Sequence, residues 1–225
     1  GIWNTGTGSG ALASNTTGDN NTATGGNALA SNTAGINNTA TGGSALINNY
    51  TGNYNTATGS DVLFNNYTGN YNTAYGSSAL VFNFTGDNNT ATGFQALFHN
   101  TTGFQNTSLG ANSLVSNTTG PYNTAVGYNT GPNSTAYYNT TCLGIDATAT
   151  GSNMVRIGNI YVGSIGGQVG WTTLSDGRFK ENVKEDIPGL AFINQLRPVS
   201  YEINREKVNE YTGLNDARNN IKVPD

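Results

Sequence analysis

The 225-residue chain is poor in charge, in cysteine and in histidine. Only 10% of its residues are charged, and it has one Cys and one His. Cys142 therefore cannot form a disulfide within the chain, and we expect it to be a small buried residue of the fold. The isolated His99 argues against histidine-based metal or triad chemistry within one chain. We expect neither a metal site nor a cofactor.

Positive charge is missing from the first two thirds of the chain. Residues 1–150 contain four aspartates and no Lys or Arg, whereas all nine basic residues lie between Arg156 and Lys222. The net charge of −4 provides no basic stripe to displace counterions, so we expect no nucleic-acid partner. Apolar runs are far shorter than the roughly 20 residues of a spanning helix, which argues against membrane insertion. No signal peptide is visible after Gly1, so an extracellular location has to be inferred from the architecture.

A pentapeptide close to NTATG recurs every 17 residues along this weakly charged region. A short period without slippage indicates one structural coil that is repeated and stacked, so most of these residues are scaffold. Its closing glycines are Gly8, Gly25, Gly42, Gly59, Gly76, Gly93, Gly110, Gly127 and Gly144.

Each coil has the approximate pattern N-T-A-T-G-x-x-A-L-x-x-N-x-T-G-x-x, which predicts two short extended pieces separated by two turns. Gly and Asn tolerate positive φ, so we expect their recurring positions to be the corners, with Asn stacked on Asn in a ladder. The corner glycines are Gly18, Gly35, Gly52, Gly69, Gly86, Gly103 and Gly120. The corner asparagines are Asn15, Asn32, Asn49, Asn66, Asn83, Asn100 and Asn117.

Two neighbouring positions of the coil are apolar. The leucine row is Leu12, Leu29, Leu46, Leu63, Leu80, Leu97 and Leu114, and the second apolar row is Ala13, Ala30, Ile47, Phe64, Val81, Phe98 and Val115. Neighbours on a strand point to opposite faces, so one row can fill the coil while the other packs between chains. We therefore predict oligomerisation; the alternative is that the second row is a tolerated exposed stripe.

Two other interpretations of the repeat are weaker. Pairs such as Thr22/Thr24 form a T-x-T column typical of ice-binding solenoids, but Tyr75, Leu109, Val126 and Leu143 interrupt it. The repeat also creates many N-x-[ST] sequons, which an Asn/Thr-rich composition generates automatically. The sequon asparagines are Asn15, Asn20, Asn37, Asn49, Asn66, Asn83, Asn88, Asn100, Asn106, Asn117, Asn133 and Asn139.

The repeat resembles the heads of trimeric autotransporter adhesins of the YadA type, whose coils contain NSVAIG; the matching segments here are NTATG at 21–25 and NTAVG at 123–127. The resemblance covers about residues 1–150. It implies an all-β solenoid, a left-handed parallel β-roll with a 17-residue repeat, assembled as a homotrimer. We assign residues 1–152 to this roll.

Beyond Gly144 the period fails. Residues 153–174 are glycine-punctuated and rich in β-formers, so we expect them to be a β neck that caps the roll. Within residues 175–225, Pro188 can start a helix with Leu190, Ile193 and Leu196 at helical spacing, and Pro198 ends it before a possible strand at 199–203, which predicts a small α+β region.

SDGRFKENV at 175–183 and LRPVSYEI at 196–203 closely resemble the intramolecular chaperone domain of phage endosialidases, tailspikes and fibres. In that family the domain drives trimerisation of the fibre before it and then cleaves itself off. The resemblance implies that Ser175 is the nucleophile, Ser175–Asp176 the scissile bond and Lys180 the base. Residues 175–225 correspond to the N-terminal half of that domain.

The implied chemistry is reasonable for these side chains. A serine hydroxyl attacks only when a base removes its proton, and a lysine can serve if its pKa is lowered. Ser175 and Lys180 are close enough in sequence for their side chains to meet in a turn. At most, then, the chain is a self-cleaving serine autoprotease.

Three functions remain open. The first is a homotrimeric fibre or adhesin, either a phage tail fibre or a bacterial surface filament, located outside the cell or on a virion. The second is a polysaccharide-degrading tailspike, which needs paired carboxylates that Asp19, Asp61, Asp87 and Asp146 do not form in sequence. The third is a monomeric ice- or glycan-binding solenoid. We favour the fibre, with self-association as the main interaction. Surface glycans are the expected ligand, because Tyr54, Tyr71 and Tyr122 should be exposed.

Overall fold

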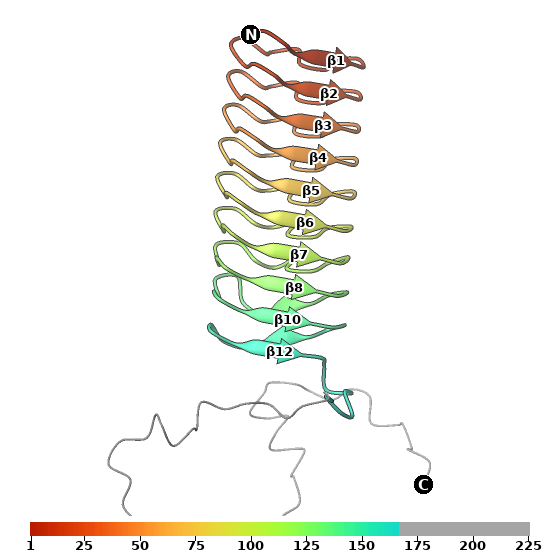
Figure 1. Ribbon diagram of the computed structural model, residues 1–225, viewed down its shortest axis with the longest axis vertical. Coiled ribbons are helices and arrows are strands. Elements are labelled where there is room, and N and C mark those ends of the chain that lie inside the picture. The colour runs from red at the N-terminus through yellow and green to blue at the C-terminus, as the bar shows by residue number, and fades with distance from the viewer. Residues whose placement is uncertain (167–225) are drawn as a thin grey trace, which may run out of the picture. The chain divides into compact units, whose positions relative to one another are not determined.

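A computed structural model describes residues 1–166, which form a stack of coils, each contributing one short strand to the same side (Figure 1). The strands of this wall are β1 Thr5–Thr7, β2 Thr22–Thr24, β3 Thr39–Thr41, β4 Thr56–Thr58, β5 Thr73–Tyr75, β6 Thr90–Thr92, β7 Thr107–Leu109, β8 Thr124–Val126, β10 Thr141–Leu143 and β12 Val155–Ile157. Two shorter strands, β9 Gly131–Pro132 and β11 Thr148–Ala149, pair separately.

The wall is one parallel ten-stranded sheet in which every strand pairs with its equivalent in the next coil. Ala23 lies opposite Ala40, and Ala40 lies opposite Ala57, so the register equals the sequence period. The prediction of an all-β parallel solenoid is confirmed for the described residues, which contain no helix. It follows that none of them forms a helix able to cross a membrane.

Each wall strand alternates between polar and small apolar residues. In β2, Thr22 and Thr24 are exposed while Ala23 is fully buried, and β3 repeats this pattern. Side chains of a strand point alternately to its two faces, so the TAT triplet places its methyl group inside the coil and its hydroxyls outside. Alanine on the wall then leaves room for the leucine row opposite, where Leu29 to Leu97 are fully buried.

The leucine-bearing segment is not a strand, which corrects the expected second extended piece. Leu29 and Leu46 have φ values of 51° and 52°, in the left-handed region, and the chain around them runs through successive turns. The Ala28 amide donates to the Gly25 carbonyl at 3.3 Å, and the Leu29 amide donates to the Ala45 carbonyl of the next coil at 3.0 Å. Because the segment is not extended, neighbouring Ala28 and Leu29 both point inward.

The second apolar row is already partly covered by its own chain. Ile47, Phe64 and Phe98 are half-buried, and Val81 is 9% exposed. Strand alternation does not force this row outward, because the segment that carries it is not a strand. The row is nevertheless the outward-facing neighbour of the leucines, and whether it contacts another chain stays a prediction.

Two ladders of asparagine run inside the roll. One consists of the asparagines that begin each NTATG, and the other of those expected at the corners. Asn66 Nδ2 donates to Asn49 Oδ1 and to the Gly69 carbonyl, both at 2.8 Å, and the same contacts recur in most coils. The expected ladder is confirmed. However, these asparagines are not among the residues with positive φ, so tolerance of positive φ is not the reason why they recur at this position.

The two glycine rows are required for different reasons. Gly25 has a φ of 135°, a backbone conformation that residues with a Cβ rarely adopt. Gly35 does not have positive φ, but a Cβ there would collide with Asn32 Oδ1 and with the Gly52 carbonyl oxygen. The second row therefore makes space for the asparagine ladder.

At its C-terminal end the roll changes its repeat. β12 pairs with β10 with Thr141 opposite Val155, a shorter step than in the preceding coils, and it lies within the predicted neck 153–174. In the two coils after Leu114, the leucine position is occupied by Gly131 and Thr148. There the segments become extended and pair with each other as β9 and β11. Residues 1–163 form one compact unit, so the wall continues beyond residue 152.

Candidate functional site

The residues predicted to carry the chemistry lie outside the described part of the chain. Ser175, Asp176 and Lys180 all follow residue 166, as does the predicted α+β region 175–225. Their assignment as nucleophile, scissile bond and base therefore stays a prediction.

The carboxylates of the roll have structural hydrogen-bond partners. Asp87 Oδ1 accepts from the Asn70 backbone N–H at 2.7 Å, and Asp146 Oδ1 accepts from Asn129 Nδ2 at 2.7 Å. Asp19 Oδ1 accepts from the Ile2 amide at 2.6 Å. Asp19 and Asp87 thus occupy the coil position at which Asn53 and Asn70 form a hydrogen-bonded ladder. Asp61 instead accepts from Ser60 Oγ at 3.0 Å. Residues 1–166 contain no group of three His, Cys, Asp or Glu residues that could hold a metal ion.

Cys142 occupies an alanine position of the wall. It is fully buried, unpaired and opposite Ala125 in the sheet. Burial raises the pKa of its thiol, so the reactive thiolate is disfavoured at neutral pH. The prediction of a small buried structural residue is confirmed.

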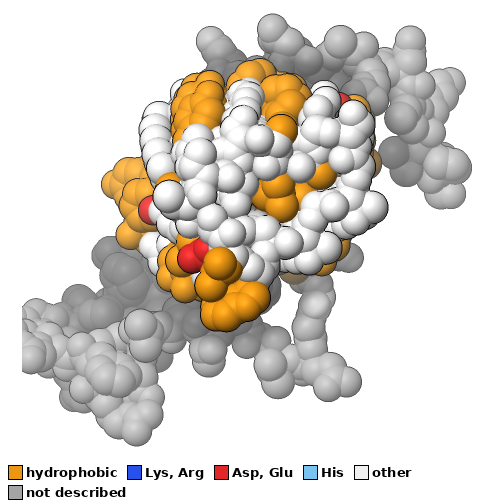
Figure 2. All heavy atoms as spheres, turned by 90° about the horizontal axis from the view of Figure 1, so that it is seen from above, with side chains coloured by type: hydrophobic (Ala, Val, Ile, Leu, Met, Phe, Trp, Pro, Cys, Tyr) orange, Lys and Arg blue, Asp and Glu red, His pale blue; other side chains and the backbone are white. Residues whose placement is uncertain are grey.

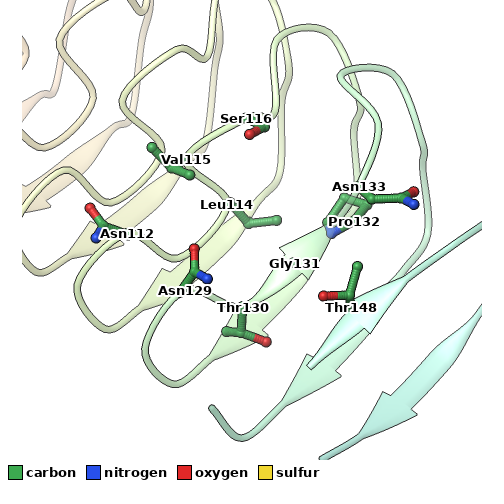
Figure 3. A pocket seen from close by; sticks show the side chains of 10 residues that line it. All are labelled: Asn112, Leu114, Val115, Ser116, Asn129, Thr130, Gly131, Pro132, Asn133 and Thr148. Atoms are coloured by element: carbon green, nitrogen blue, oxygen red, sulfur yellow. The ribbon is translucent and has the colours of Figure 1, made fainter. Parts of the chain in front are cut away.

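A small cavity of about 180 Å³ lies where the leucine row ends (Figure 3). Leu114, the last leucine, lines it together with Asn129, Thr130, Gly131 and Pro132 of the next coil and Thr148 of the coil after that. The cavity exists because Gly131 stands where earlier coils have a leucine. Asn112 also lines it, and its Oδ1 is buried without a hydrogen-bond partner among the described residues. The lining is uncharged and small, which suits water or a small polar group.

A larger groove of about 500 Å³ lies on the outside of the coils that follow β5. Phe82, Phe84 and His99 line it, together with the hydroxyl-bearing residues Thr101, Ser116, Thr118 and Thr135. The Phe82 and His99 rings are stacked with centroids 5.9 Å apart, and Phe84 continues a stack with Tyr67 at 5.1 Å. Thr101 Oγ1 donates to the Thr118 carbonyl at 3.0 Å, which leaves its oxygen lone pairs free to accept from a ligand.

The tyrosines proposed as glycan contacts are exposed. Tyr54, Tyr71 and Tyr122 are about half exposed, and the first two stack with ring centroids 4.9 Å apart. Viewed along the roll, hydrophobic side chains gather in several separate patches around its rim (Figure 2). The exposed hydrophobic surface is thus distributed over more than one side of the roll.

The sequence did not predict the groove lined by Phe82, Phe84 and His99, nor the hydrophobic row at the ends of the later wall strands. The outward residue that closes each wall strand is Thr in β2, β3 and β4, but Leu109, Val126 and Leu143 in β7, β8 and β10. These substitutions were visible as interruptions of the T-x-T column. The register of the sheet makes them direct neighbours, and the exposure of Leu109 and Val126 shows that the row faces outward.

Comparison with known families gives one match. Residues 175–221 match the family described as chaperone of endosialidase. This supports the predicted chaperone region and covers only a minor part of the chain. No curated protein matches the chain. No solved structure matches it either.

Proposed function

We propose that this protein is a structural fibre subunit that assembles as a homotrimer through its C-terminal chaperone region. The observation that carries the proposal is the chaperone-of-endosialidase match at residues 175–221, directly after a parallel β-solenoid. This combination fits a protein of the tail-fibre or tailspike type. It supports a location on a virion tail or on a cell-surface filament, outside the cell.

The composition of the roll supports a scaffold role. Its interior is built from alanine, leucine and hydrogen-bonded asparagine. Asp19 and Asp87 extend a hydrogen-bonded ladder, Asp146 pairs with Asn129, and these aspartates are separated along the roll. A tailspike that cleaves polysaccharide needs two carboxylates facing one bond, so the fibre is the better-supported function.

The chaperone region would also cleave the chain once. Ser175 supplies the nucleophilic hydroxyl, and Lys180 removes its proton. The net reaction breaks the Ser175–Asp176 peptide bond and consumes one water, giving a carboxylate on Ser175 and an amino group on Asp176. Trimerisation comes first, because an assembly domain can be released only after the fibre has formed.

Surface glycans are the ligand class that we propose for the fibre. The groove of Phe82, Phe84 and His99 combines ring surfaces with hydroxyl groups, and apolar walls with a few polar groups are typical of ligand sites. Phe82→Ala should weaken binding to a surface-glycan array, whereas Phe94→Ala, an exposed ring outside the groove, should not. Equal binding by the two variants would contradict this assignment.

Mass determination tests the assembly and the cleavage separately. Full-length protein and the Ser175→Ala variant are compared under native and denaturing conditions. We expect a trimer in both, and a break after Ser175 in the full-length protein only. A monomer in both would contradict the fibre proposal. An intact chain within a trimer would contradict the autoprotease and leave the chaperone role standing.

A further inference from the structure

One outward row of the wall turns from polar to hydrophobic along the roll. We call it the outer strand row, and it is formed by the last residue of each wall strand: Thr7, Thr24, Thr41, Thr58, Tyr75, Thr92, Leu109, Val126, Leu143 and Ile157. The residues are direct neighbours in the sheet, with Leu109 opposite Val126, Val126 opposite Leu143, and Leu143 opposite Ile157. Leu109 is 49% exposed, so the hydrophobic half faces outward.

A second hydrophobic row lies beside it at the turn that follows each strand. Tyr128 is 54% exposed and Ile145 is 56% exposed, and Phe94 holds the same position nearer the middle of the roll. In the first coils this turn position is Ser9, Gly26 or Gly43. The second row is hydrophobic from Phe94 to Ile145, and the outer strand row changes one coil later, at Leu109, so both become hydrophobic toward the C-terminal end.

The last wall strand reverses the polarity of the others. In β12, Val155 is 68% exposed and Ile157 is also exposed, whereas Arg156 between them is half-buried opposite Cys142. A wall strand that faces only water places its hydroxyls outside and its methyl inside, as β2 does. β12 instead places two aliphatic side chains outside, which is the pattern of a strand that is covered on that face.

The exposed apolar surface of these residues is comparable with the largest patches of monomeric proteins, which are often functional. An aromatic side chain buries on the order of 150–250 Å² and an aliphatic one less, so these partly exposed residues together leave several hundred Å² of apolar surface on each copy. A specific interface takes about 800 Å² from each partner, while the largest apolar patch of a typical monomer is about 300–600 Å².

The chemistry of the row suits identical partners. The outer strand row contains no charged residue, so copies of this chain can meet along it without bringing like charges together. In a trimer with its axis parallel to the roll, equal coils lie at equal heights, and hydrophobic coils meet hydrophobic coils. The hydrophobic half is also the half nearest in sequence to the chaperone match at 175–221.

We propose that the outer strand row of β7, β8, β10 and β12, with Tyr128 and Ile145 beside it, packs against the same surface of two further copies of this chain. This inference rests on the proposed trimeric fibre. It makes the C-terminal half of the roll the contact and leaves the threonine half of the row facing water.

Thiol accessibility in the full chain tests this packing. In a Cys142→Ala background, single cysteines are placed in the same row by Leu143→Cys and Thr41→Cys. In the assembled protein we expect the cysteine at 143 to react with a maleimide at least tenfold more slowly than the one at 41. Oxidation should also join two chains through position 143 and not through position 41.

A second variant removes the hydrophobic row without changing the fold. Leu109→Thr, Val126→Thr and Leu143→Thr together restore the residue that β2–β4 carry in this row, so the roll should keep its circular dichroism spectrum. The trimer of this variant should then dissociate at a protein concentration at least tenfold higher than the concentration at which the wild-type trimer dissociates. The control, Tyr54→Thr with Tyr71→Thr, changes exposed rings elsewhere and should leave dissociation unchanged.

The outcomes separate this inference from the function on which it rests. A wild-type trimer whose two cysteines react equally fast, and whose triple threonine variant stays trimeric, would overturn the packing and leave the fibre proposal intact. A wild-type monomer would overturn both. Slow labelling at 143 in a monomer would show that the row is covered by its own chain, which also overturns the proposal.

Discussion

Asparagine side chains fill positions inside the roll that most proteins give to apolar residues. An unpaired buried amide costs free energy, but here each amide is bonded to the coil before or after it. Asn66 Oδ1, for example, accepts from Asn83 Nδ2 at 2.7 Å. Because the pairs form only when equal positions stack, the ladder favours one register over all others. The same burial argues against glycosylation at sequons such as Asn66 and Asn83.

Breaking the ladder at one residue should be costly. Asn66→Ala leaves Asn49 Oδ1 without its donor and removes one acceptor from Asn83 Nδ2. We expect the free energy of unfolding to fall by about 2–4 kcal/mol, since each unsatisfied buried group costs about 1–3 kcal/mol. Urea denaturation measures the change. Asn133→Ala, an exposed asparagine, is the matched control and should change stability by less than about 0.5 kcal/mol.

Two glycine-to-alanine variants compare a crowded position beside the asparagine ladder, Gly35, with an open one, Gly26. Gly35→Ala places a Cβ against the Gly52 carbonyl and Asn32, so we expect a loss of about 2–4 kcal/mol. Gly26 has nothing within 4 Å of its added Cβ and does not have positive φ. Gly26→Ala should therefore be neutral or stabilise by up to about 1 kcal/mol. Equal thermal midpoints for the two variants would argue against the stacked geometry.

At the level of elements, each coil combines one strand with a run of turns. The wall strand follows period-two alternation, so its Thr and Ala face opposite sides. The leucine segment follows neither strand nor helix periodicity, because Leu63 has φ of 49° and neighbouring Val62 is buried with it. This places two consecutive side chains in the core, which a strand of the same length cannot do.

The conformation of the leucine segment can be tested by side-chain shape. Leu63→Ile keeps the volume but adds a β-branch at positive φ, which is strained. We expect it to destabilise the protein by about 1–3 kcal/mol, and Leu63→Met, which has no β-branch, by less than about 1.5 kcal/mol. Urea midpoints of the two variants provide the comparison. If Leu63→Ile were as stable as the wild type, the segment would be extended, as β-propensity alone predicts.

At the level of the whole molecule, the roll is a chain of near-identical units, each in contact mainly with its neighbours. Stability is then close to a sum over coils, and the length of the roll can change without changing its structure. The candidate chemistry lies in residues 175–221, separate from this scaffold. A fibre subunit can therefore vary in length and surface while keeping its assembly region.

Removal of one whole coil should leave a folded protein. Deletion of residues 39–55 joins Asn38 to Thr56 and restores the NTATG sequence, so every ladder and strand pair can re-form. We expect an unchanged circular dichroism spectrum and a small drop in the urea midpoint. Deletion of residues 39–47 joins Asn38 to Asn48 and breaks the register. A native spectrum for this shorter deletion would show that register does not govern the fold.

Much of the architecture was predictable because the period is visible in the residues themselves. The stacked coils, the buried leucines and the asparagine ladder all follow from side chains that recur every 17 residues. Ser175, Asp176 and Lys180 could be proposed because their motif is local in sequence. The turn conformation of the leucine segment was not predictable, because turn geometry at Leu63 depends on hydrogen bonds to the next coil.

The sequence by itself determined that the chain stacks one coil on another and that a chaperone-like region follows. Repetition places equal residues at equal positions, and a motif needs only its own residues to be recognised. Tertiary structure alone decided which side each row faces, because direction depends on φ and on contacts between coils. Thus Ala28 and Leu29 both point inward, while Leu109, Val126 and Leu143 form one outward row from segments that are separate in sequence.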